Sequence, residues 1–314
     1  MNLTKINYEA DEKWADVVPI LQQEGENSLA QIAYTDEYSQ ATSYLRAVMA
    51  SNEKSERAME LTEHIINMNP AHYTVWLYRA DIIKTLSLNP VKELDKLEAI
   101  SLNHPKNFQV WGYRQSIMSI IPTLPPKELS FLAKVLAKDA KNYHVWAYRQ
   151  WLVEYFSLWP TSEGKGSELF FIDSLLTNDV RNNSAWNHRY FVLFGRNVES
   201  VMPLDIFTQE INYAMAKIDT APQNASAWNY LKGILRKQKK GAKEVEHFAL
   251  QYVSLEDESK IRSSHALDLL AEIWAGEASD KACQALDLLS NKYDPVRANY
   301  WQYRKSLIKA AQAA

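Results

Sequence analysis

KNYHVWAYR, at residues 141–149, is one of six related phrases that recur along this chain of 314 residues. The other five are AHYTVWLYR (71–79), KNFQVWGYR (106–114), NNSAWNHR (182–189), QNASAWNYL (223–231) and RANYWQYR (297–304). Their tryptophans, at 76, 111, 146, 186, 228 and 301, are separated by 35, 35, 40 and 42 residues and then by nearly twice that distance. This spacing is typical of a solenoid of helical hairpins, in which each repeat buries its apolar face against its neighbours. The sequence therefore predicts an all-α fold.

The segments between the phrases carry the apolar pattern of amphipathic helices. In LTEHIINM (61–68) and LSFLAKVLA (129–137), apolar residues recur at i, i+3, i+4 and i+7. Each repeat is therefore expected to contain a first helix, a tight turn and a second helix that begins at the phrase. Residues 34–314 are predicted to form a single helical-hairpin repeat domain. Residues 1–33 lie outside the pattern and are predicted to be an N-terminal arm, either extended or a frayed cap.

Fixed positions around each tryptophan, written W−4 for the residue four before it, have separate predicted roles. Proline at W−6 can end one helix, and asparagine at W−4 can cap the next. Arginine at W+3 is expected to pair with a carboxylate or to stack on an aromatic ring of the next repeat. The residues concerned are Pro70, Pro105, Pro222 and Pro295; Asn107, Asn142, Asn182 and Asn224; and Arg79, Arg114, Arg149, Arg189 and Arg304. The tryptophans themselves are expected to fill the seams between hairpins.

Composition and charge narrow the class of protein. The chain has 35 Lys and Arg against 38 Asp and Glu, a net charge of −3, which removes the general electrostatic case for binding nucleic acid. Cys283 is the only cysteine, so no internal disulfide can form and a reducing, cytoplasmic location is favoured. No run of about 18 apolar residues appears, so a membrane-spanning segment is not expected.

The polar residues that open the second and third phrases are the strongest candidates for a functional site, because no GxSxG, HExxH, GxGxxG or zinc-ligand cluster occurs. They are Lys106, Asn107, Phe108 and Gln109, followed by Lys141, Asn142, Tyr143 and His144. Adjacent hairpins stack about 8 to 10 Å apart, so both sets are expected on one rim. Two lysines, a Tyr–His pair and two helix N-termini suit an anion such as a phosphate or a carboxylate. Any helix start is polar, so a purely structural role stays open.

The same phrases carry a resemblance to a known family. PKNFQVW, DAKNYHVWAYRQW, DVRNNSAWNHRYFV and PQNASAWNYLKGIL closely resemble the α subunit shared by protein farnesyltransferase and protein geranylgeranyltransferase type I. The likeness extends upstream through residues 34–62 and downstream through KYDPVRANYWQYR at 292–304. It implies a crescent-shaped, right-handed superhelical solenoid of about seven helical hairpins, wrapped around a β subunit that is an α–α barrel.

The resemblance also implies an activity that needs both subunits. The heterodimer would transfer a farnesyl or geranylgeranyl group from the prenyl diphosphate to the cysteine thiol of C-terminal CaaX motifs. In that family the zinc ion and its ligands belong to the β subunit, where zinc makes the substrate thiolate available at neutral pH. Magnesium is implied as an aid to diphosphate departure in the farnesyl enzyme. The implied partners are the farnesyltransferase β subunit and the geranylgeranyltransferase type I β subunit.

Roles for single residues follow from the match of motifs. Lys106 falls on the lysine that touches the prenyl diphosphate, and Gln109 on the glutamine that binds the C-terminal carboxylate of the CaaX substrate. Asn142, Tyr143 and His144 match the neighbouring patch around diphosphate and peptide. The resemblance thus implies Lys106, Tyr143 and His144 as catalytic residues and Gln109 and Asn142 as substrate-binding residues.

Two aromatic residues complete the implied substrate-binding set. Tyr73 matches the aromatic side chain that the preceding repeat contributes. Phe108 stands where the family more often has tyrosine, so packing is expected to survive here while any hydrogen bond from that hydroxyl is absent.

Two other interpretations stay open from the sequence. The α subunit of Rab geranylgeranyltransferase is also built on tryptophan-phrase hairpins, but its repeats do not usually carry the PKNxQVW and KNYHVW tetrads. A TPR-like or half-TPR scaffold would show the same periodicity with no catalytic role. A pure scaffold has no need of Lys106, Gln109 and His144 together, whereas a site for a diphosphate and a carboxylate does.

Overall fold

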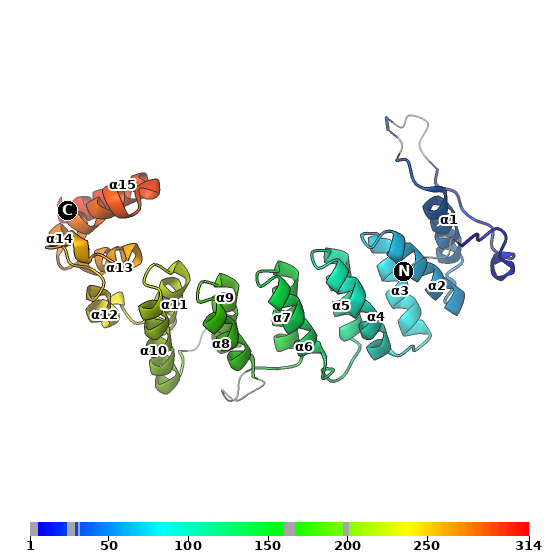
Figure 1. Ribbon diagram of the computed structural model, residues 1–314, viewed down its shortest axis with the longest axis horizontal. Helices are drawn as coiled ribbons and strands as arrows, with labels where there is room; N and C mark the ends of the chain where they lie inside the picture. Colours follow the sequence, from blue (N-terminus) through cyan, green and yellow to red (C-terminus); the bar gives the residue numbers. More distant parts are fainter. Residues whose placement is uncertain (1–5, 24–28, 31, 160–166, 197–200, 314) are drawn as a thin grey trace. The chain divides into compact units, whose positions relative to one another are not determined.

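Helices make up every regular element in the part of the chain that the structure describes (Figure 1). The structure is a computed structural model that describes residues 6–23, 29–30, 32–159, 167–196 and 201–313. The all-α prediction is confirmed. In these ranges no helix combines the length and the apolar character needed to cross a bilayer.

The chain divides into two compact units, Met1–Leu152 and Val153–Ala314. The helices of the first are α1 (Asp36–Ala50), α2 (Glu56–Met68), α3 (Tyr73–Thr85), α4 (Pro90–Asn103), α5 (Phe108–Met118), α6 (Glu128–Lys138) and α7 (Tyr143–Tyr155), which crosses the boundary. Those of the second are α8 (Glu168–Asn178), α9 (Asn183–Phe194), α10 (Leu204–Thr220), α11 (Ala225–Lys237), α12 (Glu246–Leu250), α13 (Ser264–Trp274), α14 (Ser279–Leu288) and α15 (Ala298–Ala313). The single repeat domain over residues 34–314 stays a prediction.

Each phrase opens the second helix of a hairpin, as predicted: the phrases coincide with the starts of α3, α5, α7, α9, α11 and α15. The asparagines at W−4 cap these helices. Asn107 Oδ1 accepts hydrogen bonds from the backbone N–H groups of Gln109 and Val110, at 2.9 and 3.2 Å. Asn142, Asn182 and Asn224 cap α7, α9 and α11 in the same way. The predicted N-caps are therefore confirmed.

The repeat tryptophans are buried, and their indole N–H groups hold the turns. Trp76 Nε1 donates to the carbonyl oxygen of Pro70, six residues earlier, at 2.9 Å. The same W to W−6 bond forms in the next four phrases, from Trp111, Trp146, Trp186 and Trp228, at 2.8 to 2.9 Å. A buried indole needs such an acceptor. Tryptophan therefore fills the seam between hairpins and also fixes the turn that precedes its own helix.

The W−6 carbonyl is also the link between neighbouring repeats. Asn142 Nδ2 donates to the Pro105 carbonyl at 2.9 Å, and Asn224 Nδ2 donates to the Val180 carbonyl at 2.7 Å. Ser263 Oγ donates to the Pro222 carbonyl at 2.6 Å. Ser263 thus occupies the W−4 position of a repeat that has no tryptophan, which explains the double interval before Trp301. Its hairpin is formed by α12 and α13.

Three of the arginines at W+3 form the carboxylate pairs that the sequence predicts, and these pairs are buried. Arg79 pairs with Glu93, Arg114 with Glu128 and Arg189 with Glu210, each through two N–O contacts between 2.5 and 3.0 Å. Arg114 and Arg189 also lie over the rings of Phe131 and Tyr213, at 4.3 and 3.7 Å from the ring centres. The glutamates accept from tyrosines of the following repeat as well, at 2.8 Å for Tyr113 to Glu93 and 2.5 Å for Tyr230 to Glu210. Glu93 and Glu210 therefore each join two successive second helices.

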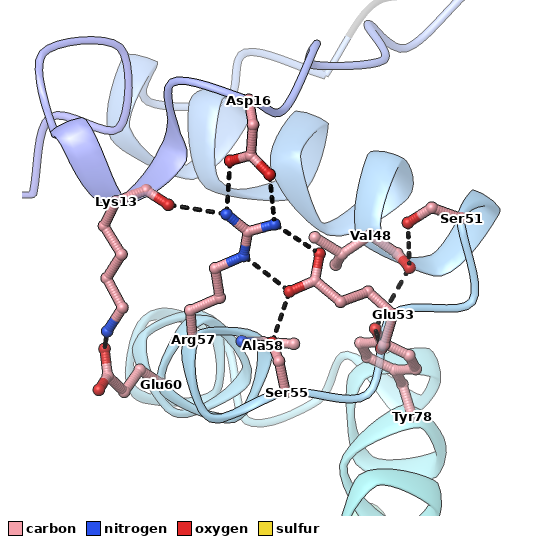
Figure 2. Close-up of polar contacts among 10 residues, drawn as sticks. All are labelled: Lys13, Asp16, Val48, Ser51, Glu53, Ser55, Arg57, Ala58, Glu60 and Tyr78. Atoms are coloured by element: carbon pink, nitrogen blue, oxygen red, sulfur yellow. Dashed lines mark hydrogen bonds and ion pairs between the residues drawn. The ribbon is translucent and has the colours of Figure 1, made fainter.

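The described part of the N-terminal arm packs against α1 and α2. Tyr8 and Trp14 are only 2% and 3% exposed, and the Tyr8 hydroxyl is 2.6 Å from Nδ1 of the buried His64. Arg57 clamps the arm, because its guanidinium donates to both Asp16 carboxylate oxygens at 2.6 and 3.0 Å and to Glu53 (Figure 2). The arm is therefore anchored to α1 and α2 at Tyr8, Trp14 and Asp16. The N-terminal arm over residues 1–33 stays a prediction.

Candidate functional site

The start of α5 carries the first set of predicted site residues. Lys106 is exposed and precedes the capping residue Asn107, while Gln109 is half-buried in the first turn. Within the described residues, Lys106 forms no ion pair and the Gln109 side chain makes no hydrogen bond. Asn107 occupies the N–H groups of Gln109 and Val110. These two N–H groups are therefore not free to bind an anion, and the candidate for contact with an anion at this helix start is the Lys106 ammonium.

The start of α7 carries the second set. Tyr143 is 78% exposed and His144 is half-buried, and their rings meet edge to face at 5.6 Å between centres. Asn142 is different, since it is only 3% exposed. Its oxygen accepts from the N–H of Val145 at 3.1 Å, and its amide nitrogen donates to the Pro105 carbonyl.

Asn142 is placed differently from its neighbours. Its buried side chain uses its oxygen and its nitrogen in contacts within the chain. These contacts fix the position of the two residues that follow it, Tyr143 and His144, as the structural interpretation of the W−4 asparagines predicts. The substrate-binding role implied for Asn142 stays a prediction.

The bond from Asn142 to Pro105 also brings the two sets together. Pro105 directly precedes Lys106, and Asn142 directly precedes Tyr143. A 2.9 Å contact between Asn142 Nδ2 and the Pro105 carbonyl oxygen therefore places the starts of α5 and α7 side by side. The prediction that both sets share one rim is confirmed, and the rim is held by a hydrogen bond that recurs in other repeats.

Exposed aromatic side chains mark this rim in three successive repeats. Tyr73, Phe108 and Tyr143 all occupy W−3, and they are 66%, 67% and 78% exposed. Tyr73 and Phe108 stand on opposite sides of a groove between α3 and α5 that has a volume of 360 Å³. Gln109 lines the same groove. Tyr73, Phe108 and Gln109 are therefore brought together as the sequence predicts.

Leu77 and Gly112 are among the residues of this groove that sequence reasoning missed. Leu77 is 65% exposed, and Gly112 lies in the interior of α5. Both occupy W+1. The signal was present in the sequence, because W+1 and W−3 are one helical turn apart and share a face. A leucine and a glycine between the tryptophan and the tyrosine of a phrase nevertheless look like ordinary helix residues.

Metal ligands do not gather in the described part of the chain. Within those ranges, no three His, Cys, Asp or Glu side chains lie close enough together to hold a metal ion.

A family model covers about half of the chain. The protein prenyltransferase alpha subunit repeat matches residues 55–86, 90–121, 125–156, 166–195 and 207–238. These segments coincide with the five hairpins from α2–α3 to α10–α11.

The chain belongs to the protein prenyltransferase α subunits. Its relatives include the protein farnesyltransferase/geranylgeranyltransferase type-1 subunit alpha of Candida albicans, which is 40% identical over 93% of this chain and 96% of the relative. The subunit of the same name from Dictyostelium discoideum is 35% identical over 94% of this chain and 92% of the relative. The resemblance inferred from the phrases is therefore confirmed.

A solved structure agrees with this family assignment of the α subunit. The structure of Candida albicans protein geranylgeranyltransferase-I complexed with GGPP contains a chain that is 38% identical and gives a TM-score of 0.85. The match covers 95% of this α subunit and 100% of that chain. By contrast, the geranylgeranyl transferase type-2 subunit alpha of Saccharomyces cerevisiae matches over only 23% of this chain, at 34% identity. The shared α subunit, rather than the type-2 subunit or a generic scaffold, is the correct assignment.

Proposed function

We propose that this chain is the α subunit of a heterodimeric protein prenyltransferase, active only with a β subunit, that transfers farnesyl or geranylgeranyl from the prenyl diphosphate to the cysteine of C-terminal CaaX motifs. One observation carries the proposal beyond family membership. The two polar sets that such an activity requires lie side by side at the starts of α5 and α7, joined by the bond from Asn142 to the Pro105 carbonyl. The activity assigns the chain to the cytoplasm, where such substrates are made.

Lys106 would act on the leaving group. In the transfer, the substrate sulfur bonds to carbon 1 of the prenyl group while the bond from that carbon to the diphosphate oxygen breaks, and the diphosphate departs with the electron pair. Negative charge therefore grows on the diphosphate in the transition state. An exposed ammonium without an internal carboxylate partner can stabilise that charge, so Lys106 is an electrostatic catalyst and not a base.

Tyr143 and His144 would complete the diphosphate-facing part of the site. The Tyr143 hydroxyl and one ring N–H of His144 are hydrogen-bond donors on the helix start next to Lys106. Their T-shaped contact holds the two rings in a defined orientation. We assign both to binding the diphosphate oxygens as the prenyl bond breaks.

Gln109 would bind the C-terminal carboxylate of the substrate peptide. Its amide N–H₂ can donate to a carboxylate, and within the described residues this side chain has no other hydrogen bond to lose. Tyr73 and Phe108 flank it on the groove between α3 and α5, where they give apolar contact to the substrate. Because Phe108 has no hydroxyl, Gln109 is the polar anchor of this side of the site.

We assign the reacting thiol to the CaaX substrate and the metal ions to components other than this chain. In the described ranges no cluster of side chains fits a zinc ion, and we assign zinc and magnesium to the β subunit and to the bound diphosphate. Metal chemistry therefore comes from outside this chain, and the role of the α subunit is to bind and orient the substrates and to stabilise charge.

The test is reconstitution with a β subunit. Co-expression with a farnesyltransferase or geranylgeranyltransferase type I β chain is expected to give a complex that prenylates a CaaX peptide, whereas neither chain does so alone. Lys106→Ala should assemble normally and lower the single-turnover rate by about 10²- to 10³-fold. Lys141→Ala, which removes the equivalent W−5 lysine of the next repeat, is the matched control and should leave the rate within about threefold.

Three results would be decisive against parts of this proposal. Failure of the wild-type chain to assemble with either β subunit would reject the heterodimer. Assembly without transfer would reject the activity. Normal single-turnover chemistry in Lys106→Ala would assign Lys106 to structure.

A further inference from the structure

The C-terminal end of α11 carries a run of cations that the proposed function does not use. RKQKKGAK, at residues 236–243, holds five lysines and arginines and no acid, in a chain whose net charge is −3. The helix dipole accounts for Arg236 and Lys237, which lie in the last turn of α11. It does not account for Lys239 and Lys240, which follow the end of the helix.

Lys239 stands at a backbone position that disfavours a lysine. Its φ is 56°, in the left-handed region that glycine adopts at little cost at the end of a helix. The other non-glycine residues with a positive φ in the described ranges are small and polar: Asn52, Ser87 and Ser157. A long cation is therefore kept here against the preference of the backbone, and it forms no ion pair with a described residue.

The other cations of the run are only weakly matched by acids. Arg236 is exposed and forms no ion pair within the described residues. Lys240 lies 3.6 Å from Glu244, and about half of each side chain is exposed, at 46% and 52%. Exposed pairs of this kind contribute little. Four cations at 236–240 stand against two exposed acids, Glu244 and Asp205, so the local charge stays positive.

Exposed apolar side chains lie beside this run. Gln238, in the middle of the run, holds the residues just before α10, the other helix of this hairpin (Figure 1). Its Oε1 accepts from the Met202 N–H at 3.1 Å, and its Nε2 donates to the Met202 carbonyl at 3.3 Å. Val201 and Leu204, on either side of Met202, are 52% and 68% exposed. We call the following residues the basic–apolar patch: Val201, Leu204, Arg236, Lys239 and Lys240.

We propose that the basic–apolar patch is a docking surface for an anionic lipid membrane. Cations close to such a membrane attract its phosphate and carboxylate head groups, and exposed apolar side chains enter the boundary between head groups and acyl chains. The patch presents both kinds of side chain on one hairpin. The net charge of the chain does not oppose the contact, because charges much farther than about 8 Å from the membrane are screened at physiological salt.

A nucleic acid or an acidic peptide fits the patch less well. Single-stranded nucleic acids are held by cations together with aromatic rings that stack on the bases, and no exposed aromatic residue lies at 201–204 or 236–243. Peptides are selected by grooves or sheet edges that fix their side chains, whereas Arg236 and Lys239 are long, exposed and unpaired within the described ranges. A lipid surface requires only that the charges come close to it.

Vesicle binding by the full chain tests the proposal and is independent of the proposed function, since it involves neither prenyl transfer nor the β subunit. The chain should co-sediment with vesicles of equimolar phosphatidylserine and phosphatidylcholine and bind much more weakly to phosphatidylcholine alone. The neutral vesicles report any adhesion of the exposed rim residues Tyr73, Leu77 and Phe108. Raising the salt from about 0.1 M to about 1 M should abolish the binding, because the Debye length falls from about 10 Å to about 3 Å.

Neutral substitutions identify the cations. The triple variant Arg236→Gln, Lys239→Gln and Lys240→Gln should bind anionic vesicles about 100-fold more weakly, since each cation near the surface contributes roughly fivefold. Lys239→Gly alone should weaken binding about fivefold. This single variant should melt no lower than the wild type, because glycine suits the left-handed backbone. It therefore keeps the proposal testable if the triple variant folds poorly.

Two further variants separate charge from apolar contact. The matched control, Lys84→Gln, Lys92→Gln and Lys138→Gln, removes the same charge from exposed positions of the first unit and should bind within about threefold of the wild type. Val201→Ser with Leu204→Ser should weaken binding to anionic vesicles about tenfold and leave its salt dependence unchanged.

Four results would overturn the membrane surface. They are the absence of wild-type binding to anionic vesicles, equal binding to anionic and neutral vesicles, unchanged binding of the triple variant, and unchanged binding of Lys239→Gly. Binding to a polyglutamate peptide or a single-stranded RNA, but not to vesicles, and its loss in the triple variant, would assign the patch to an acidic macromolecule instead.

Discussion

The two units use the same repeat but present different side chains on it. From residue 71 to 231, the positions W−5, W−3 and W+1 are exposed in every phrase. In the first unit W−3 is Tyr73, Phe108 and Tyr143, and W+1 is Leu77, Gly112 and Ala147. In the next two phrases W−3 is Asn183 and Ala225, and W+1 is Asn187 and Asn229. The first unit therefore offers an aromatic and apolar rim, and the second a small and polar one.

A groove in the first unit and a cavity in the second differ in polarity in the same way as these exposed positions. The groove between α3 and α5 has apolar walls, whereas a cavity of 340 Å³ in the second unit is lined by Asn229, His265, Asp268, Asp294 and Arg297 among others. Its charges are largely internally matched: Asp268 pairs with Lys232 at 3.0 Å and with Arg304, and Asp294 lies 3.2 Å from Arg297. Paired charges of this kind stabilise a surface, whereas within the described ranges Lys106 of the first unit forms no ion pair and the Gln109 side chain makes no hydrogen bond. From this comparison we infer that function resides in exposed positions that vary between repeats.

Both units contain the same buried Arg–Glu pairs. Removing an arginine from such a pair should therefore have the largest effect on stability, and the effect should be the same in each unit. Arg114→Ala leaves Glu128 buried without its partner, and Arg189→Ala does the same to Glu210. Each should lower the free energy of unfolding by about 3–5 kcal/mol, measured by urea denaturation of the heterodimer or of the chain alone. Lys96→Ala, which removes an exposed pair with Glu63, is the control and should cost less than about 1 kcal/mol. A large loss of stability in only one of the two arginine variants would contradict the equivalence of the two units.

The W−4 asparagines should separate stability from activity. Asn142→Ala and Asn224→Ala each remove a helix cap and a bond to the preceding turn, so each should cost about 1–2 kcal/mol in urea denaturation. Only Asn142 holds the helix start that carries Tyr143 and His144. Asn142→Ala should therefore also slow single-turnover transfer by about tenfold, while Asn224→Ala leaves it unchanged. Equal transfer rates in the two variants would contradict the positioning role of Asn142.

The N-terminal clamp that Arg57 forms with Asp16 and Glu53 should show the smallest effect, and in the wild-type chain this effect should appear only in acid. Hydrogen bonds from Arg57 hold the pKa values of Glu53 and Asp16 below their ordinary range. A lowered folded-state pKa means that the clamp contributes fully above the unfolded-state pKa, about 4. The contribution of the clamp to stability is lost as the pH falls through the lowered folded-state pKa values of Glu53 and Asp16.

Hydrogen exchange measures this directly. Amides of residues 7–17 should stay protected from pH 7 to 5 and lose protection below about pH 4, before the buried helices do. Arg57→Ala should lose that protection already at pH 7. Protection that is unchanged in Arg57→Ala would show that burial of Tyr8 and Trp14 holds the arm without the clamp.

Much of the fold follows from the sequence because tryptophan, asparagine, proline and arginine each recur at a fixed position and make the same contacts there. The tryptophan needs an acceptor six residues back, the asparagine caps the helix, and the arginine needs a carboxylate, so repetition of the letters predicts repetition of the contacts. The repeat formed by α12 and α13 escaped notice because Ser263 makes the same bond to Pro222 as an asparagine would, with Leu267 in place of tryptophan. Only the position of the Ser263 hydroxyl in the structure reveals this repeat.

The candidate site was harder to predict in full because exposed side chains are not fixed by contacts within the chain. Lys106, Gln109, Tyr143 and His144 are exposed or half-buried, whereas Asn142 is buried. Leu77 and Gly112 of the groove between α3 and α5 were missed because both look like ordinary helix residues in the sequence.

The most direct test of the central claim compares the same W−5 position in the two units. Lys106→Ala in the first unit and Arg181→Ala in the second each remove one exposed cation from the start of a phrase helix. Single-turnover prenyl transfer by each assembled heterodimer is the measurement. We expect a loss of about 10²- to 10³-fold for Lys106→Ala and a rate within about threefold of wild type for Arg181→Ala. Equal losses, or a loss confined to Arg181→Ala, would contradict the assignment of the chemistry to the first unit.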